Sequence, residues 1–146
     1  MAVPDIVTSN GLLWPLSRDP AFRLVRLCKE DEGVSICAGL AAAGRRSVLL
    51  MQQTGLMDSL NAIRAIAVEY AQPVCMVVGL QGKEPERTAE GSDRYGVRIV
   101  PAILDAMGID RIAIEGPGDE AALASSIARA YARSRPMAAL IGRTVL

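Results

Sequence analysis

Short apolar runs alternate along the chain with longer segments in which apolar residues recur every three or four positions. This alternation is typical of a parallel sheet covered by helices on both faces. The pattern therefore predicts a three-layer α/β/α fold with a six-stranded, mostly parallel sheet. The runs expected to form strands are Asp5 to Thr8, Phe22 to Leu27, Ser47 to Gln52, Val74 to Val78, Arg111 to Glu115 and Met137 to Ile141.

Four helical segments are expected between these runs. The first follows Glu30 and ends at Gly44, which fits a glycine C-cap. The third is short, from Pro101 to Met107, and the fourth is capped by Asp119. The second has one apolar face, formed by Leu56, Leu60, Ile63, Ala67 and Tyr70.

A polar stretch from Gly79 to Tyr95 follows the fourth apolar run directly. It carries three glycines and one proline, so we expect a long functional loop there. Basic residues in or beside it could hold an anionic substrate, but a solvated loop face is the simpler interpretation. These residues are Lys83, Arg87, Arg94 and Arg98.

The length of 146 residues fits a single domain spanning 1–146. Sixteen basic and sixteen acidic residues balance, and no basic stretch has interleaved aromatics, which excludes nucleic acid as a partner. No apolar run is long enough to span a membrane, and Met1 to Pro4 shows no signal sequence. We therefore expect a soluble, cytoplasmic protein without membrane contact.

Cysteine and histidine usage limits the chemistry further. Cys28, Cys37 and Cys75 lack metal-ligand spacing and lie in apolar surroundings, which predicts reduced, buried thiols and no metal site. The chain has no histidine, so it cannot contain a Ser-His or Cys-His nucleophile. Any chemistry must use carboxylates or a cofactor.

Ligands of open parallel sheets bind beyond the carboxyl ends of the strands. Polar groups follow each of the first four expected strands, and the topology predicts that they share one edge. From position alone, stabilisation by the helix dipole is the simpler interpretation of Glu30, and an ordinary strand-to-helix turn is the simpler interpretation of Thr54 and Gly55. The groups are Ser9 and Asn10, then Glu30 with its acidic neighbours, then Gln53, Thr54 and Gly55, then the long loop.

Two ordered stretches carry a resemblance to a known family. The first is Lys29-Glu30-Asp31-Glu32-Gly33-Val34, followed by Cys37-Ala38-Gly39-Leu40, and the second is Met51-Gln52-Gln53-Thr54-Gly55-Leu56-Met57-Asp58-Ser59-Leu60-Asn61-Ala62. Together they resemble the alpha subunit of sulfopyruvate decarboxylase, a family related to phosphonopyruvate decarboxylase. The similarity extends over nearly the whole chain.

The resemblance implies the pyrimidine-binding domain of thiamine-diphosphate enzymes. There, a glutamate matching Glu30 hydrogen-bonds N1′ of the aminopyrimidine and favours its imino tautomer, which provides a base for cofactor activation. The resemblance makes Glu30 the catalytic residue, and Glu30, Gln53, Thr54 and Gly55 the cofactor-binding ones. Residues expected to face the substrate are Ser9, Asn10, Gln52 and Gln81, although a plain turn is an equally good interpretation of Ser9 and Asn10.

The family's diphosphate site is missing from this chain, because no Gly-Asp-Gly motif with a downstream asparagine occurs. The resemblance therefore implies a separate diphosphate-binding beta subunit. That subunit would bind Mg²⁺, share the thiamine diphosphate, and form an α2β2 or higher assembly acting on a small 2-oxo acid.

Two departures from the family limit what can be carried over. Relatives tend to have arginine where this chain has Gln81 and a histidine in the following loop, so the reaction class is inferred but not the substrate. A non-catalytic assembly or regulatory subunit of the same fold stays open. A flavodoxin-like or receiver-like binding module fits the alternation too, but a receiver needs an aspartate where Gln53 stands.

Overall fold

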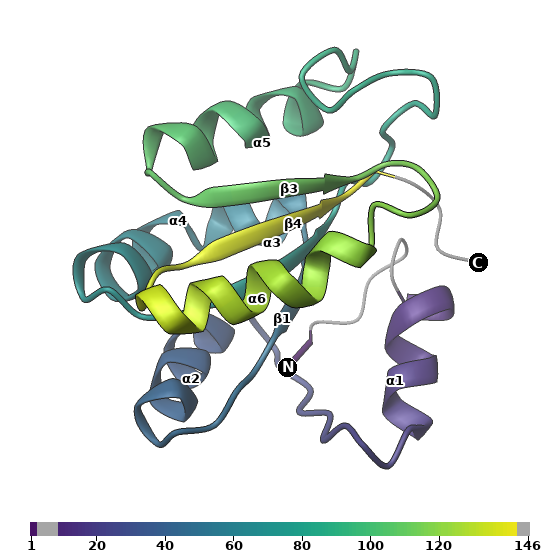
Figure 1. The fold of residues 1–146 in the computed structure, drawn as a ribbon. Coiled ribbons are helices and arrows are strands. Elements are labelled where there is room, and N and C mark those ends of the chain that lie inside the picture. The colour runs from purple at the N-terminus through teal and green to yellow at the C-terminus, as the bar shows by residue number, and fades with distance from the viewer. Residues whose placement is uncertain (3–8, 143–146) are drawn as a thin grey trace.

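The computed structural model describes residues 1–2 and 9–142, and it has an α/β fold around a parallel sheet. The four strands are β1 (Leu49–Gln52), β2 (Cys75–Gly79), β3 (Asp110–Ile114) and β4 (Met137–Ile141), in the spatial order β1-β2-β4-β3. All neighbouring pairs are parallel, so the carboxyl ends of the strands lie at one edge, where the arrowheads of Figure 1 point. The α/β class and the last four expected strands are confirmed.

The sheet of six strands is not confirmed. Residues 22–27 form no regular strand in the structure: Arg26 makes an isolated parallel bridge to Ala2, which bridges to Leu50 on its other side. The segment lies at the sheet's margin, with Phe22 57% and Val25 38% exposed, so little burial supports a longer ladder. The strand expected at Asp5 to Thr8 lies outside the described residues.

Helices connect the strands, as expected for parallel neighbours. A π-helical turn, η1 (Ser9–Leu13), leads into the short α1. The segment after β1 is broken into two short helices and a second π-helical stretch. The helices are α1 (Trp14–Arg18), α2 (Glu30–Ala42), α3 (Gln53–Asp58), α4 (Leu60–Ala62), η2 (Ile63–Glu69), α5 (Tyr95–Ala106) and α6 (Ala121–Arg133).

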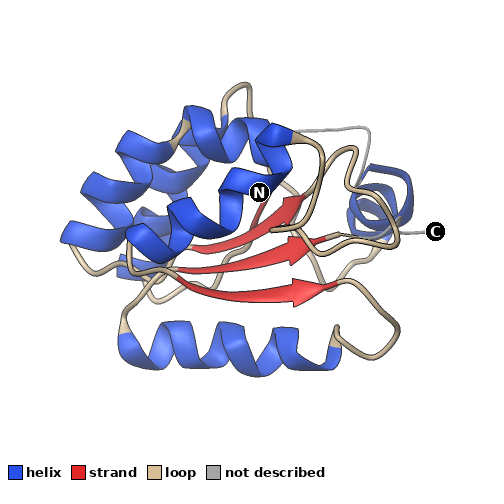
Figure 2. Ribbon diagram, turned by 90° about the horizontal axis from the view of Figure 1, so that it is seen from above, coloured by secondary structure: helices blue, strands red, loops and turns tan. Residues whose placement is uncertain are grey.

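Two apolar clusters cover the two faces of the sheet, because alternate strand residues point to opposite sides. On β1, Leu49 and Met51 belong to one cluster with α2, α3, η2 and α5. Leu50 belongs to the other cluster, together with α6 and the helical region around α1. Figure 2 shows helices on both sides of the strands. Strands buried on both faces explain the nearly continuous apolar runs of the sequence.

The expected start of the third helix at Pro101 is wrong, since α5 begins at Tyr95 and contains Pro101 in its interior. An interior proline costs about 3 kcal/mol in helix stability. Here Val97, Val100 and Leu104 are fully buried at helical spacing, so packing against the sheet maintains the helix through the proline.

Three further expectations need correction. Tyr70 does not share the buried face of the second helical segment; it follows η2 and is 74% exposed. Asp119 is not the N-cap of α6, because its carboxylate accepts hydrogen bonds from the backbone N–H groups of Glu115 (2.9 Å) and Gly116 (2.7 Å) and closes the turn after β3. Cys28 is exposed, whereas Cys37 and Cys75 are buried as expected.

No helix in the described part of the chain is both long and apolar enough to cross a bilayer.

Candidate functional site

Glu30 is the first residue of α2, and its carboxylate lies against the backbone of Gly55 in α3. A Cβ atom placed on Gly55 would overlap the Cδ and Oε1 atoms of Glu30. Only glycine permits this approach, since every other residue has a Cβ. Within the described residues, no hydrogen bond or ion pair reaches the Glu30 carboxylate. Close packing against Gly55 therefore positions the Glu30 side chain near the carboxyl end of β1. Its carboxylate oxygens accept no hydrogen bond from the described residues.

The acidic neighbours of Glu30 have other roles. The ammonium of Lys29 lies 3.2 Å from Asp58 and 3.7 Å from Asp31. The hydrogen bond with Asp58 is the main reason that the pKa of Lys29 is raised. Asp31 also accepts a 2.9 Å hydrogen bond from the backbone N–H of Glu32, whose side chain is exposed. Of the three acids, Glu30 is the one whose carboxylate packs against α3, directly after β1.

Gln53 ties the end of β1 to the loop after β2. Its amide donates to the backbone carbonyl of Gln81 (3.1 Å) and accepts from the backbone N–H of Gln81 (2.8 Å). Gln53 is only 6% exposed, so this paired contact is largely shielded from water. Both halves of the amide expected to contact the cofactor are thus engaged by the protein.

The other expected site residues lie at the same edge. Gln52 ends β1 and is half-buried, and Thr54 is exposed with one long contact of 3.5 Å from its hydroxyl to Gln52. The side chains of Ser9 and Asn10 lie outside the described part of the structure. The contacts described above bring together Glu30, Gln52, Gln53, Thr54, Gly55 and Gln81.

The loop after β2, residues 80–94, arches beyond the arrowhead end of the sheet (Figure 1) and is fastened at several points. The side chain of Lys83 is 2% exposed, and its ammonium lies 3.6 Å from Glu115 at the end of β3. The hydroxyl of Ser92, itself buried, donates to Glu84 at 2.7 Å. Sequence reasoning missed Ser92 and Glu115; a buried serine within a polar loop leaves no periodic signal.

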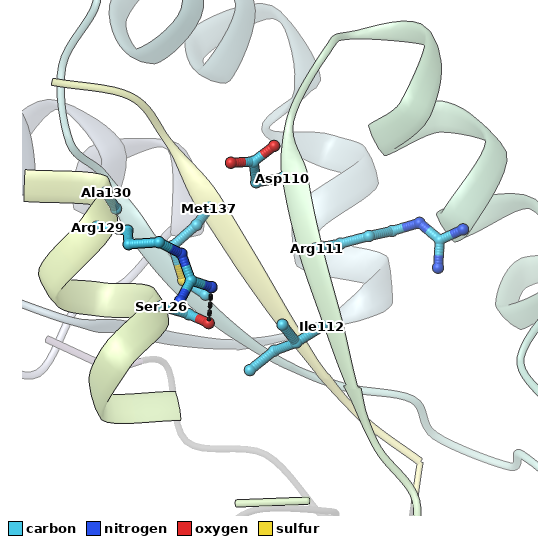
Figure 3. Close-up of a pocket in the computed structure, with 7 residues that line it drawn as sticks. All are labelled: Asp110, Arg111, Ile112, Ser126, Arg129, Ala130 and Met137. Atoms are coloured by element: carbon cyan, nitrogen blue, oxygen red, sulfur yellow. Dashed lines mark hydrogen bonds between the residues drawn. The ribbon is translucent and has the colours of Figure 1, made fainter. Parts of the chain in front are cut away.

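A small cavity of about 150 Å³ lies elsewhere, between α6 and the start of β3 and β4. Figure 3 shows Arg129 hydrogen-bonded to Ser126 at this cavity, while Arg111 points away from it. The cavity is at the amino ends of the strands, opposite the edge that carries Glu30. We therefore do not assign it to the candidate site.

Metal ligands are not gathered in the described residues, where no cluster of three or more His, Cys, Asp or Glu side chains could hold an ion. No family model matches the chain.

Curated proteins, however, do match it. The alpha subunit of sulfopyruvate decarboxylase from Methanococcus maripaludis is 32% identical over 89 residues, and that from Methanothermobacter thermautotrophicus is 37% identical over 80 residues. The sulfopyruvate decarboxylase of Methanosarcina acetivorans is 31% identical over 124 residues, which is 85% of this chain. The chain is a homologue of sulfopyruvate decarboxylases. The resemblance found in the sequence is thus confirmed.

The match covers only part of these sulfopyruvate decarboxylases. The aligned region is 57% of this chain and 53% of the Methanococcus subunit, and 55% of this chain and 48% of the Methanothermobacter subunit. It is 32% of the Methanosarcina protein. The chain therefore spans about half the length of the alpha subunits it matches, and about a third of the longer protein.

Proposed function

We propose that this chain is the pyrimidine-binding alpha subunit of a thiamine-diphosphate-dependent 2-oxo acid decarboxylase, with the three-layer fold of that enzyme class. The observation that carries the proposal is the Glu30 carboxylate, which lies at the ligand-binding edge of a parallel sheet against a glycine. Within the described residues its acceptor atoms have no partner, which fits a group waiting for a ligand's N–H. The names of the relatives support the reaction class.

Thiamine diphosphate, when bound, supplies the electron sink that decarboxylation of a 2-oxo acid requires. Glu30 would accept the hydrogen bond from pyrimidine N1′ and hold that proton during activation. Thr54 and Gly55 would line the pyrimidine, and Gln53 would keep the loop at Gln81 in place beside it. Gln52 and Gln81, with Ser9 and Asn10, would face the substrate.

A partner subunit is part of the proposal. The chain has no Gly-Asp-Gly motif, so we assign Mg²⁺ and the diphosphate to a beta subunit in an α2β2 or higher assembly. Three relatives are themselves named as alpha subunits. The Methanosarcina protein, whose name carries no subunit label, extends well beyond the region matched here. That length is consistent with both functions in one polypeptide.

Calorimetric titration of thiamine diphosphate with Mg²⁺ tests the proposal, on the full chain alone and on the chain mixed with its beta subunit. We expect tight binding only in the mixture, accompanied by release of carbon dioxide from 2-oxo acids. Binding in neither sample would contradict the proposal and favour a non-catalytic assembly subunit or a simple binding module.

The substitution Glu30→Gln in the assembled complex tests the proposed role of Glu30 in activating the cofactor. The amide retains the shape of the carboxylate but not its charge, so the fold should persist while the rate of carbon dioxide release falls at least about a hundredfold. Glu32→Gln, at an exposed neighbouring carboxylate, should leave the rate unchanged. Equal turnover of the two variants would remove Glu30 from the mechanism.

A further inference from the structure

Of the basic side chains in and beside the loop after β2, one has no hydrogen bond or ion pair with a residue that the structure describes. Lys83 pairs with Glu115 and donates to the carbonyl of Glu84 at 3.0 Å. Arg87 pairs with Asp93 at 2.6 Å and donates to the carbonyl of Gly91. These two cations therefore fasten the loop and are not available to a ligand.

Arg98 is engaged as well. Its guanidinium donates a 2.7 Å hydrogen bond to the carbonyl of Ser92 and lies 5.7 Å from the centre of the Tyr95 ring. The guanidinium of Arg94, by contrast, has no hydrogen bond or ion pair with any described residue. Arg94 is thus the cation of this loop whose donors remain open.

The position of Arg94 is set by its backbone and by the stem of its side chain. Its N–H donates to the hydroxyl of Ser92 at 3.1 Å, and that hydroxyl is itself held by Glu84. The stem lies over Gly82, since a Cβ at that position would be 3.7 to 3.9 Å from Nε, Cγ and Cδ of Arg94. Gly82 has a φ of +81°, a conformation that favours glycine.

Contacts connect Arg94 to the edge that carries Glu30. Gly82 directly follows Gln81, whose N–H and carbonyl are both held by the buried amide of Gln53. Two residues after Gln53 comes Gly55, which contacts the Glu30 carboxylate. The Arg94 guanidinium, on the loop after β2, and the Glu30 carboxylate, which packs on the segment after β1, are therefore linked to the same sheet edge, and neither is paired with a described residue.

We propose that Arg94 is a substrate-binding residue that selects 2-oxo acids with a second acidic group, by forming a paired hydrogen bond to that group. This rests on the proposed function. A guanidinium presents two parallel N–H donors that match a carboxylate or sulfonate, and such charge-assisted contacts are stronger than neutral ones. A positive group at this edge also offsets the repulsion between Glu30 and a doubly charged substrate.

The test compares two substrates of similar length in the assembled complex: sulfopyruvate, and the singly charged 2-oxobutanoate. Arg94→Gln should lower kcat/KM for sulfopyruvate by about ten- to a hundredfold and change that for 2-oxobutanoate by less than about twofold. Arg94→Lys should recover part of the loss, because lysine restores the positive charge but not the two parallel N–H donors of the guanidinium. Arg87→Gln is the matched control and should leave the ratio of the two kcat/KM values unchanged. An Arg94→Gln variant that loses both activities equally, or neither, overturns the proposal.

A second measurement separates this proposal from the proposed function. The full chain labelled with nitrogen-15 is titrated with sulfoacetate, and the Nε–H resonance of Arg94 is followed. A saturable shift that disappears in Arg94→Gln supports the binding role even if the complex decarboxylates nothing. If the complex is inactive and the Arg94 resonance does not shift, Arg94 is a solvated surface residue and the proposal fails.

Discussion

At the scale of single residues, the contact between Gly55 and Glu30 should matter for activity more than for folding stability. A Cβ at position 55 would overlap the end of the Glu30 side chain, which can rotate away, and not the backbone. Gly55→Ala should therefore fold, at a cost of no more than about 1–3 kcal/mol in unfolding free energy. It should also displace the carboxylate and lower carbon dioxide release at least about a hundredfold. Urea denaturation and steady-state assays of the complex measure the two effects.

Gly39→Ala is the matched control for this substitution. Gly39 lies within α2, and a Cβ placed there would meet no described atom within 4 Å apart from its chain neighbours and the nearby backbone of its own helix. Alanine is the better helix former, so this variant should gain about 0.5–1 kcal/mol in stability and keep its turnover. Full activity in Gly55→Ala would show that the close packing of Glu30 has no catalytic consequence.

The location of Gln53 could be predicted from the sequence, but the hydrogen-bond partner of its side-chain amide could not. Its position after β1 predicted correctly that it lies at the ligand-binding edge, because strand ends share one edge in a parallel sheet. Its bonding to Gln81 depends on which loop lies opposite, 28 positions along the chain. Side-chain partners of this kind are set by the tertiary fold and leave no signal in local sequence.

At the scale of elements, the three buried strands β1, β2 and β4 were predictable, because burial on both faces requires uninterrupted apolar residues. The position at which α5 begins could not be predicted from the sequence. Pro101 is a common helix beginning, and the stabilising contacts that extend the helix back to Tyr95 come from Val97 and Val100 against the sheet. The segment at 22–27 has strand-like composition, but it lacks neighbours that would bury it.

In the loop after β2, Ser92 links several residues, because its hydroxyl donates to Glu84 and accepts from the backbone N–H of Arg94. The hydroxyl of Ser92 is the main reason that the pKa of Glu84 lies below its usual range. A depressed folded-state pKa means that this contact stabilises the loop above the ordinary glutamate pKa of about 4.3 and is lost as pH falls through the lower value. Ser92→Ala should therefore raise the pKa of Glu84, as measured by carbon-13 NMR titration of its carboxyl.

Thr88→Val provides the comparison in that titration. The Thr88 hydroxyl accepts a 3.2 Å hydrogen bond from the N–H of Gly91 within the same loop and makes no hydrogen bond with Glu84. The pKa of Glu84 should be the same in this variant as in the parent protein. A rise of equal size in both variants would mean that general loosening of the loop, and not the Ser92 hydroxyl, determines the titration.

At the scale of the whole molecule, two thiols report on the two apolar clusters. Cys37 lies in the cluster of α2, α3, η2 and α5, and Cys75 in the cluster that includes α6. Burial raises the pKa of Cys37, and it raises the pKa of Cys75 to about 12. The thiolate is the reactive form, so neither should react in the native protein near neutral pH. Exposed Cys28 should react within seconds of adding a disulfide reagent and is removed by Cys28→Ser.

With Cys28 removed, the two clusters can be compared through single-thiol variants, one keeping Cys37 and the other Cys75. β1 and β2 contribute side chains to both clusters, so opening one face should disrupt the sheet and expose the other. We therefore expect both thiols to be labelled at the same rate, set by global unfolding, at every urea concentration. Faster labelling of Cys75 would mean that the α6 face opens on its own, so that the chain would comprise two units of different stability. The site residues Glu30, Gln53 and Gly55 all belong to elements that pack on the Cys37 face, so the site would then lie in the unit that stays folded when the α6 face opens.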